Sequence, residues 1–174
     1  MANESSAFGD ITVKANTFEQ AKRIIELINS FTDQLKYYTC FNTESISSHK
    51  EGEAKCSFYA EGRWDFSSNI ESMGESIKNS SKTSEDKEII KELEGYQFDL
   101  TFDYTDEERG ESFLCQAVVS LTHNANTPLE KMIYNRLQHQ SFDYTVENLC
   151  EKCDYDEEYA RELCGDSKEE QEVA

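Results

Sequence analysis

The sequence has few of the residues that interrupt a chain, and it has no long apolar run. Its 174 residues include one proline, Pro128, and seven glycines, so no Pro/Gly-rich linker divides it. No run of about 18 apolar residues is present, which argues against a transmembrane helix. The first nine residues contain neither a basic nor an apolar segment, so we expect no signal peptide. These absences predict a cytoplasmic protein, and the length suits one domain, or one domain with an appendage.

Basic residues are also scarce. The chain has 36 Asp and Glu against 17 Lys and Arg, which gives a formal net charge of −19. Residues 141–174 alone hold twelve acidic and three basic residues. A surface of this sign repels phosphate backbones and anionic membranes and attracts basic protein grooves. We therefore expect a basic, nucleic-acid-binding protein as the partner, with no direct contact to nucleic acid or membrane.

Alternating and helical apolar patterns predict an α+β fold. The expected strands are 11–13, 36–41, 54–60, 96–105 and 113–121, and the expected helices in this part are 17–31, 68–77 and 84–94. The first six elements match the ferredoxin-like split βαβ arrangement, with one extra antiparallel strand. We therefore predict a ferredoxin-like core over 1–124, an acidic helical extension over 125–165 and a disordered tail over 166–174.

Start signals for helices concentrate in the last third of the chain. The segment Thr127-Pro128-Leu129-Glu130 is typical of a capping box with proline at the first helical position. Apolar residues then continue at helical spacing through Leu137, which predicts a helix. Two further helices are expected, one from Thr145 and one that ends at Gly165.

The six cysteines are expected to be reduced thiols, with disulfides as the less favoured alternative. His139, Cys150, Cys153 and Cys164 have the spacing H-x10-C-x2-C-x10-C, and four such ligands can hold zinc tetrahedrally. However, these cysteines lie at helical spacing among apolar residues, where a free thiol behaves as a small hydrophobic group. We favour packing and expect no cofactor, and a zinc-stabilised protein-binding module is the alternative.

No catalytic motif is evident. The chain has no G-x-S-x-G, Walker A or G-x-G-x-x-G segment, and none of its three histidines lies beside a nucleophile in a known pattern. Asp99 and Asp103 share one face of a predicted strand, but in so acidic a chain we interpret the pair as a coincidence. A hydrolase would gain support only if both carboxylates faced a pocket. We expect a protein that is not an enzyme.

The acidity itself is the strongest functional signal. Carboxylates spaced along a rigid element can imitate the phosphates of a nucleic acid, and aromatic side chains between them can anchor a partner. The alternative is that the charge serves only solubility. The residues that we predict to bind the partner are Asp143, Asp154, Asp156, Glu157, Glu158 and Glu162. A second candidate is an expected hairpin turn with Asp106, Glu107 and Glu108.

One segment carries a resemblance. Residues 57–66, with the sequence SFYAEGRWDF, follow a βα unit and resemble segments of small acidic ferredoxin-like accessory proteins of phages and mobile elements. The resemblance carries no catalytic residue. It implies an anti-defence role in a bacterial cytosol, in which the protein disables a restriction or CRISPR nuclease. The structural interpretation of the same segment is a turn at Gly62, with Trp64 covering the edge of the core and Arg63 pairing with an acid.

Overall fold

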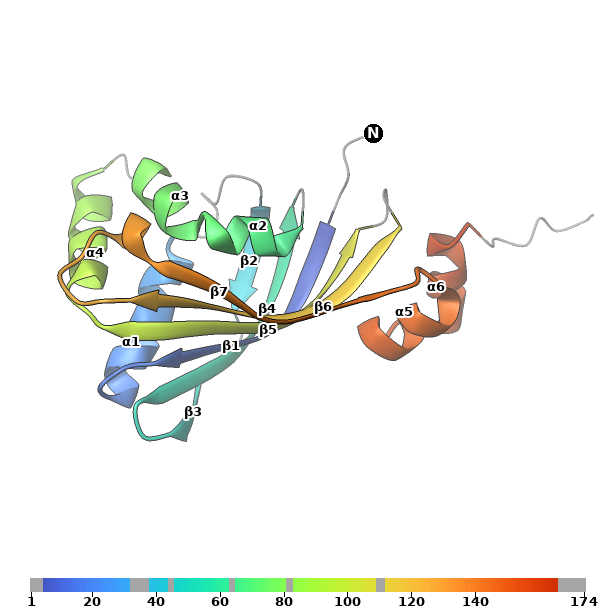
Figure 1. Ribbon diagram of the computed structural model, residues 1–174, viewed down its shortest axis with the longest axis horizontal. Coiled ribbons are helices and arrows are strands. Elements are labelled where there is room, and N and C mark those ends of the chain that lie inside the picture. Colours follow the sequence, from blue (N-terminus) through green and yellow to red (C-terminus); the bar gives the residue numbers. More distant parts are fainter. Residues whose placement is uncertain are drawn as a thin grey trace, which may run out of the picture.

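The computed structural model describes residues 5–31, 38–43, 46–62, 65–80, 83–108 and 112–165. They form a seven-stranded antiparallel sheet with helices (Figure 1). The strands are β1 (Ser5–Lys14), β2 (Tyr38–Thr43), β3 (Ser47–Lys50), β4 (Glu53–Gly62), β5 (Phe98–Glu108), β6 (Phe113–His123) and β7 (Ile133–Phe142). The helices are α1 (Phe18–Asn29), α2 (Phe66–Glu71), α3 (Met73–Ser80), α4 (Ser84–Glu94), the 3-10 helix η3 (Leu129–Lys131), α5 (Val146–Cys153) and α6 (Glu157–Leu163).

The order of the strands differs from their order in the sequence. Across the sheet it is β2-β4-β1-β5-β6-β7, and the short β3 also pairs with β4. Because β4 lies between β1 and β2 and is antiparallel to both, β1 and β2 run in the same direction with α1 between them in the chain. Strands β5, β6 and β7 follow as a simple meander.

The main core lies between one face of the sheet and helices α1 to α4. In β1, β4, β5 and β6 the buried apolar residues of this face recur at alternate positions, as the period of two predicts. A cluster of aromatic rings fills its centre: Phe66 of α2 stacks on Phe58 at 5.1 Å and meets Tyr104 edge-on at 5.0 Å. The expected α+β class and the antiparallel sheet are therefore confirmed.

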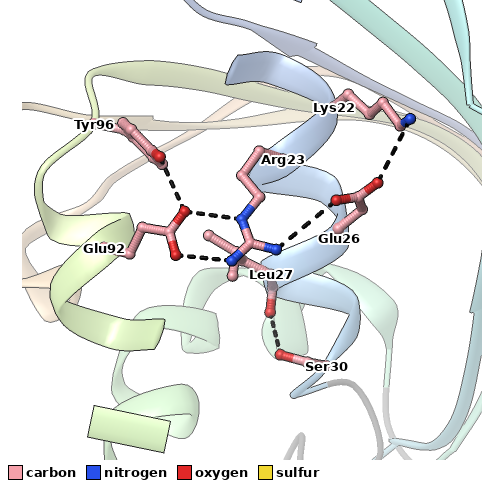
Figure 2. Close-up of polar contacts among 7 residues, drawn as sticks. All are labelled: Lys22, Arg23, Glu26, Leu27, Ser30, Glu92 and Tyr96. Carbon is pink, nitrogen blue, oxygen red and sulfur yellow. Dashed lines mark hydrogen bonds and ion pairs between the residues drawn. The ribbon is translucent and has the colours of Figure 1, made fainter. Parts of the chain in front are cut away.

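Helices α1 and α4 are joined at the surface by an ion pair with two hydrogen bonds. Figure 2 shows the Arg23 guanidinium donating to both carboxylate oxygens of Glu92, at 2.8 and 2.9 Å. The Tyr96 hydroxyl donates to the same carboxylate at 3.0 Å. These three donors hold the pKa of Glu92 below its usual range, with the hydrogen bond from Arg23 as the largest cause.

The starts of the helices before β5 follow the capping signals, with one correction. Thr17 and Thr83 cap α1 and α4, and Thr83 forms a full capping box with Asp86. The start predicted at Ser68 is wrong, because α2 begins at Phe66 and the Asp65 side chain accepts from the Ser68 N–H at 2.8 Å. The carboxylate one turn earlier competes successfully because it accepts more strongly than a hydroxyl.

Helix α3 packs directly on η3. A Cβ built on Gly74 would lie 2.2 Å from the carbonyl oxygen of Leu129, so only glycine permits this approach. Lys78 and Glu130 pair across the same contact. The segment 124–131 is also held by the buried His123, whose ring nitrogens face the carbonyl oxygens of Tyr96 and Thr127 at 2.7 and 2.9 Å.

The helix predicted from Thr127 to Leu137 is wrong. Its start signals produce only the single turn η3, and residues 133–142 form the strand β7. The edge of β6 pairs with this segment from Ile133 to Phe142, with one irregularity at Leu137, and such tertiary pairing overrides helical spacing. Residues 125–165 therefore contain a strand of the sheet in addition to the helices α5 and α6.

Residues 42–52, between the expected strands 36–41 and 54–60, contain the end of β2 and the short strand β3, which the sequence patterns did not indicate. The predicted tail 166–174 and the residues Arg63, Trp64, Arg109 and Gly110 lie outside the described residues. Within the described part of the chain, no helix is long and apolar enough to cross a membrane.

Candidate partner-binding site

A concentration of exposed acidic residues lies on the helical hairpin formed by residues 143–165. This hairpin, which comprises α5 and α6, holds eight carboxylates and two basic side chains, and all eight acidic residues are exposed. Figure 1 shows the hairpin at the end of the sheet away from α1 and α4.

The hairpin contains the two helices that the sequence predicts, and a side chain caps the start of each one. The Thr145 side chain accepts from the Asn148 N–H and begins α5, and the Asp156 carboxylate accepts from the Tyr159 N–H and begins α6. Between the helices, Asp154 adopts the left-handed conformation with φ 57°, which permits a tight connection. The aromatic rings of Tyr155 and Tyr159 meet edge-on at 5.0 Å.

A small second core attaches the hairpin to the sheet. Its buried members are Leu114, Leu149, Cys153 and Ala160, and Phe8 packs against them. Phe8 and Leu114 alternate with residues that face the main core, so the hairpin covers one end of the opposite face of the sheet.

Polar contacts add to this attachment. The hydroxyl of Thr105 in β5 donates to the Lys152 carbonyl at 3.4 Å, and the Tyr144 hydroxyl donates to Glu107. The Lys152 ammonium lies 4.9 Å from the centre of the Phe142 ring. The same ammonium pairs with the Glu151 carboxylate at 2.5 Å, so this lysine neutralises one of the acidic side chains of the hairpin.

The six carboxylates singled out from the sequence all lie exposed on this hairpin. Glu157 is paired with Arg161 one turn later, and Asp156 is engaged as the cap of α6. The six residues are Asp143, Asp154, Asp156, Glu157, Glu158 and Glu162. All six therefore lie on the same helical hairpin, to which the exposed residues Glu147 and Glu151 of α5 also belong.

The second candidate contact, the turn at Asp106, Glu107 and Glu108, is wrong. These residues belong to β5, and their relative exposures are 1%, 0% and 9%. Asp106 accepts from the Ser5 hydroxyl at 2.5 Å and from the Phe66 N–H at 2.7 Å. Burial raises the pKa of Asp106 to about 6, against the opposing effect of these two donors. Strand β5 pairs regularly with β1 and β6 as far as Glu108. The three acidic residues that the sequence predicts in a turn therefore belong to a strand.

The zinc alternative is also not supported. Among the described residues, no group of three or more His, Cys, Asp and Glu side chains could hold a metal ion. His139 lies exposed on β7, whereas Cys150, Cys153 and Cys164 belong to the small second core. Burial, with a smaller contribution from Glu107, raises the pKa of the Cys153 thiol to about 12. The cysteines of this motif therefore act as packing groups.

A groove of about 660 Å³ lies on the uncovered face of the sheet beside the hairpin. Asp10 and Asp103 face each other across β1 and β5 in its wall, and Lys55 pairs with Asp10 at 2.9 Å. Asp99 is not in the wall and accepts from the Thr122 hydroxyl at 2.7 Å. Only one of the two carboxylates expected for a hydrolase thus faces the groove.

Sequence reasoning did not find this groove. Its other polar lining residues come from the consecutive strands β5, β6 and β7, whereas Asp10 comes from the distant β1: they are Thr105, Gln116, Gln138, His139 and Gln140. Alternation in each strand assigns side chains to a face, but only the register between strands places Asp10 beside Asp103. Phe8 lines the groove and also packs against the second core, so the groove ends where the hairpin begins.

Comparison of the chain with protein-family models, with curated proteins and with solved structures found no match.

Proposed function

We propose that this protein is a non-enzymatic acidic interaction protein that binds a basic, nucleic-acid-handling protein through the hairpin of residues 143–165. The observation that supports the proposal is the gathering of eight exposed carboxylates on one capped and anchored element. Fixed carboxylates can form several charge-assisted contacts with Lys and Arg at little cost in ordering.

The groove extends the same surface. Asp10 and Asp103 place two more carboxylates beside the hairpin, and the polar side chains around them can accept or donate hydrogen bonds. A lysine- or arginine-bearing loop of the partner would lie along the hairpin and enter the groove. Charge complementarity of this kind speeds association and fixes orientation, and its effect falls as salt rises.

For the partner class, we propose a nuclease of the bacterial defence systems, with the hairpin occupying its nucleic-acid channel. The resemblance of residues 57–66 to accessory proteins of phages and mobile elements motivates this choice. An inhibitor that imitates nucleic acid would compete with duplex DNA for the same basic channel, which separates it from an adaptor that binds elsewhere.

We also propose a ferredoxin-like origin for the first part of the sheet. The order β2-β4-β1-β5, all antiparallel and with helices between β1 and β2 and between β4 and β5, supports it. Strands β6 and β7 and the hairpin would then be additions to this core, and they carry much of the surface to which we assign the function.

The test is capture of partners from a bacterial lysate at about 0.1 and 0.5 M salt, where the Debye length falls from about 10 Å to roughly half of that. One variant neutralises the hairpin by Glu147→Gln, Asp154→Asn, Glu157→Gln, Glu158→Gln and Glu162→Gln. A matched control removes five exposed charges from α1 to α4 by Glu19→Gln, Glu71→Gln, Glu75→Gln, Glu85→Gln and Glu88→Gln.

We expect the wild type and the control to retain a basic protein at low salt and the hairpin variant to lose it. Duplex DNA added to the capture should release the partner. Equal loss in both variants would indicate that total charge alone matters, and capture that ignores salt would contradict the proposal. Capture that DNA does not disturb would retain the interaction but reject nucleic-acid imitation.

A further inference from the structure

The groove on the uncovered face of the sheet consists of two rows of side chains that cross β1, β5 and β6. Strand register aligns the members of each row, and both rows continue onto β7. The rows share one face of the sheet because they are two residues apart along each strand. The first row is Asp10, Asp103 and Val118, and the second is Phe8, Thr105 and Gln116.

The first row has more negative than positive charge around it. Asp10 accepts from the Ser57 hydroxyl at 3.1 Å and pairs with the Lys55 ammonium at 2.9 Å. The carboxylate of Asp103 is exposed and has no hydrogen bond or ion pair within the described part of the chain. Both carboxylates raise the pKa of Lys55, with the hydrogen bond to Asp10 as the largest cause. One lysine therefore faces two carboxylates, and a ligand with a single positive charge would balance the groove.

A chain of hydrogen bonds fixes the side-chain amide of Gln116 in the second row. The Thr105 hydroxyl has one proton, which it donates to the Lys152 carbonyl at 3.4 Å. The same hydroxyl therefore accepts from the Gln116 amide nitrogen, at 3.3 Å. With its nitrogen turned to Thr105, Gln116 keeps its amide oxygen as an acceptor for a ligand in the groove. Lys152 belongs to α5, so the hairpin takes part in setting this orientation.

We propose that the groove binds the guanidinium of an arginine of the partner, with Asp103 and Gln116 as its acceptors. This inference rests on the proposed function, because it assigns the basic residue that enters the groove beside the hairpin. Asp103 and Gln116 are diagonal neighbours on β5 and β6, at positions about 7–8 Å apart. A guanidinium has donors on opposite edges of one plane, so it can reach both groups at once.

A lysine fits the same lining less well. Its ammonium is a compact and strongly hydrated charge, so contact with Asp103 would leave the Gln116 oxygen to water. Val118 lies directly across from Asp103 on β6, and Phe8 lines the groove where it meets the hairpin. These apolar side chains can pack against the methylene stem and the weakly hydrated faces of a guanidinium. The lining therefore favours arginine by shape and hydration as well as by charge.

The experiment is a titration of the full-length protein with N-acetyl-arginine methylamide at constant ionic strength, followed by the NMR shifts of the amide groups of β5 and β6. The lysine analogue of this probe has the same charge, and the citrulline analogue has nearly the same shape without the charge. We expect the arginine probe to bind with a dissociation constant on the order of 1–10 mM. The lysine probe should bind at least about tenfold more weakly, and the citrulline probe should give no saturable shift.

Three variants locate the site. Asp103→Asn should weaken binding of the arginine probe about tenfold, and Gln116→Met, which removes the acceptor at similar length, should weaken it severalfold. Asp99→Asn is the matched control, because Asp99 lies on the same face of β5 but outside the groove, where it accepts from the Thr122 hydroxyl. This control should leave binding unchanged. Circular dichroism melts of each variant establish that loss of binding is not loss of the fold.

Equal binding of the arginine and lysine probes, or equal losses in Asp103→Asn and Asp99→Asn, would overturn the proposal, since negative charge alone would then account for binding. A protein that binds no arginine probe overturns it as well. Because the titration needs no partner, its result is separate from the lysate capture. Failure of the capture together with intact binding of the arginine probe would reject the hairpin as the binding surface and leave the ligand of the groove unchanged.

Discussion

Asp106 is a buried carboxylate at the start of α2. It accepts from the Phe66 N–H, the first residue of that helix, and from the Ser5 hydroxyl of β1. An anion at a helix N-terminus is favourable, yet removal from water is the larger effect here and raises the pKa to about 6. Asp106 therefore connects β1, β5 and α2, and the free energy that its burial costs depends on pH.

The sign of that dependence can be tested with Asp106→Asn. A carboxyl whose pKa is raised on folding binds its proton more tightly in the folded state, so its contribution to stability is greatest at low pH. That contribution is lost as pH rises through about 6. The free energy of unfolding of the variant relative to wild type should rise by about 2–3 kcal/mol between roughly pH 4 and 7.

Urea unfolding at several pH values measures this difference. Glu158→Gln removes one charge from an exposed position of the hairpin and serves as the control. A difference between Asp106→Asn and wild type that stays flat over this pH range would mean that Asp106 is not held in the buried form.

At the scale of elements, the contact between α3 and η3 depends on one glycine. Gly74→Ala would place a methyl group against the Leu129 carbonyl at 2.2 Å, so the two helices must separate. We expect a loss of about 1–3 kcal/mol in the free energy of unfolding. Gly95→Ala is the control, since Gly95 has an ordinary right-handed conformation and its nearest atom is at 3.2 Å. Thermal melts that rank Gly95→Ala as the more harmful change would contradict this account of the contact.

The hairpin has its own core, so it should also have its own stability. Leu149 is fully buried there, and Leu149→Ala should cost about 2–4 kcal/mol locally. Hydrogen exchange should accelerate in α5 and α6 and stay unchanged in β1 and β5. Equal acceleration in all four elements would show that the chain unfolds as one unit. Because the proposed binding needs a fixed hairpin, this variant should also weaken partner capture.

Local signals predicted elements well where one signal dominated. The right elements were predicted from the caps at Thr17 and Thr145 and from the alternation in β4. In each case the side-chain pattern and the observed backbone conformation favour the same element. Prediction failed at β7, where helical start signals and spacing competed with the free edge of β6. It failed at Asp106 for a related reason: a run of acids is typical of a turn, and only the neighbouring strands make it a buried strand end. The acidic hairpin was predictable because charge and caps coincide in a short stretch of sequence.

At the scale of the whole molecule, excess negative charge opposes folding. The net charge of −19 creates repulsion that the compact state concentrates and the unfolded chain relieves. We therefore expect the melting temperature to rise by several degrees between about 20 and 300 mM NaCl, as the Debye length shortens. Differential scanning calorimetry checks this, and a melting temperature that falls with NaCl would show that ion pairs such as Arg23–Glu92 outweigh the repulsion.

Each of the two cores contains a buried cysteine whose chemical modification can report when that core opens. Cys56 belongs to the main core and Cys153 to the second one, and burial is the main cause that raises their pKa to about 11 and about 12. Because the thiolate is the reactive form, alkylating agents should modify each residue only when its own core opens. Mass spectrometry of a labelling time course would then follow the opening of the sheet and of the hairpin separately in the unaltered protein. If Cys153 is modified well before Cys56, the hairpin can detach while the sheet remains folded.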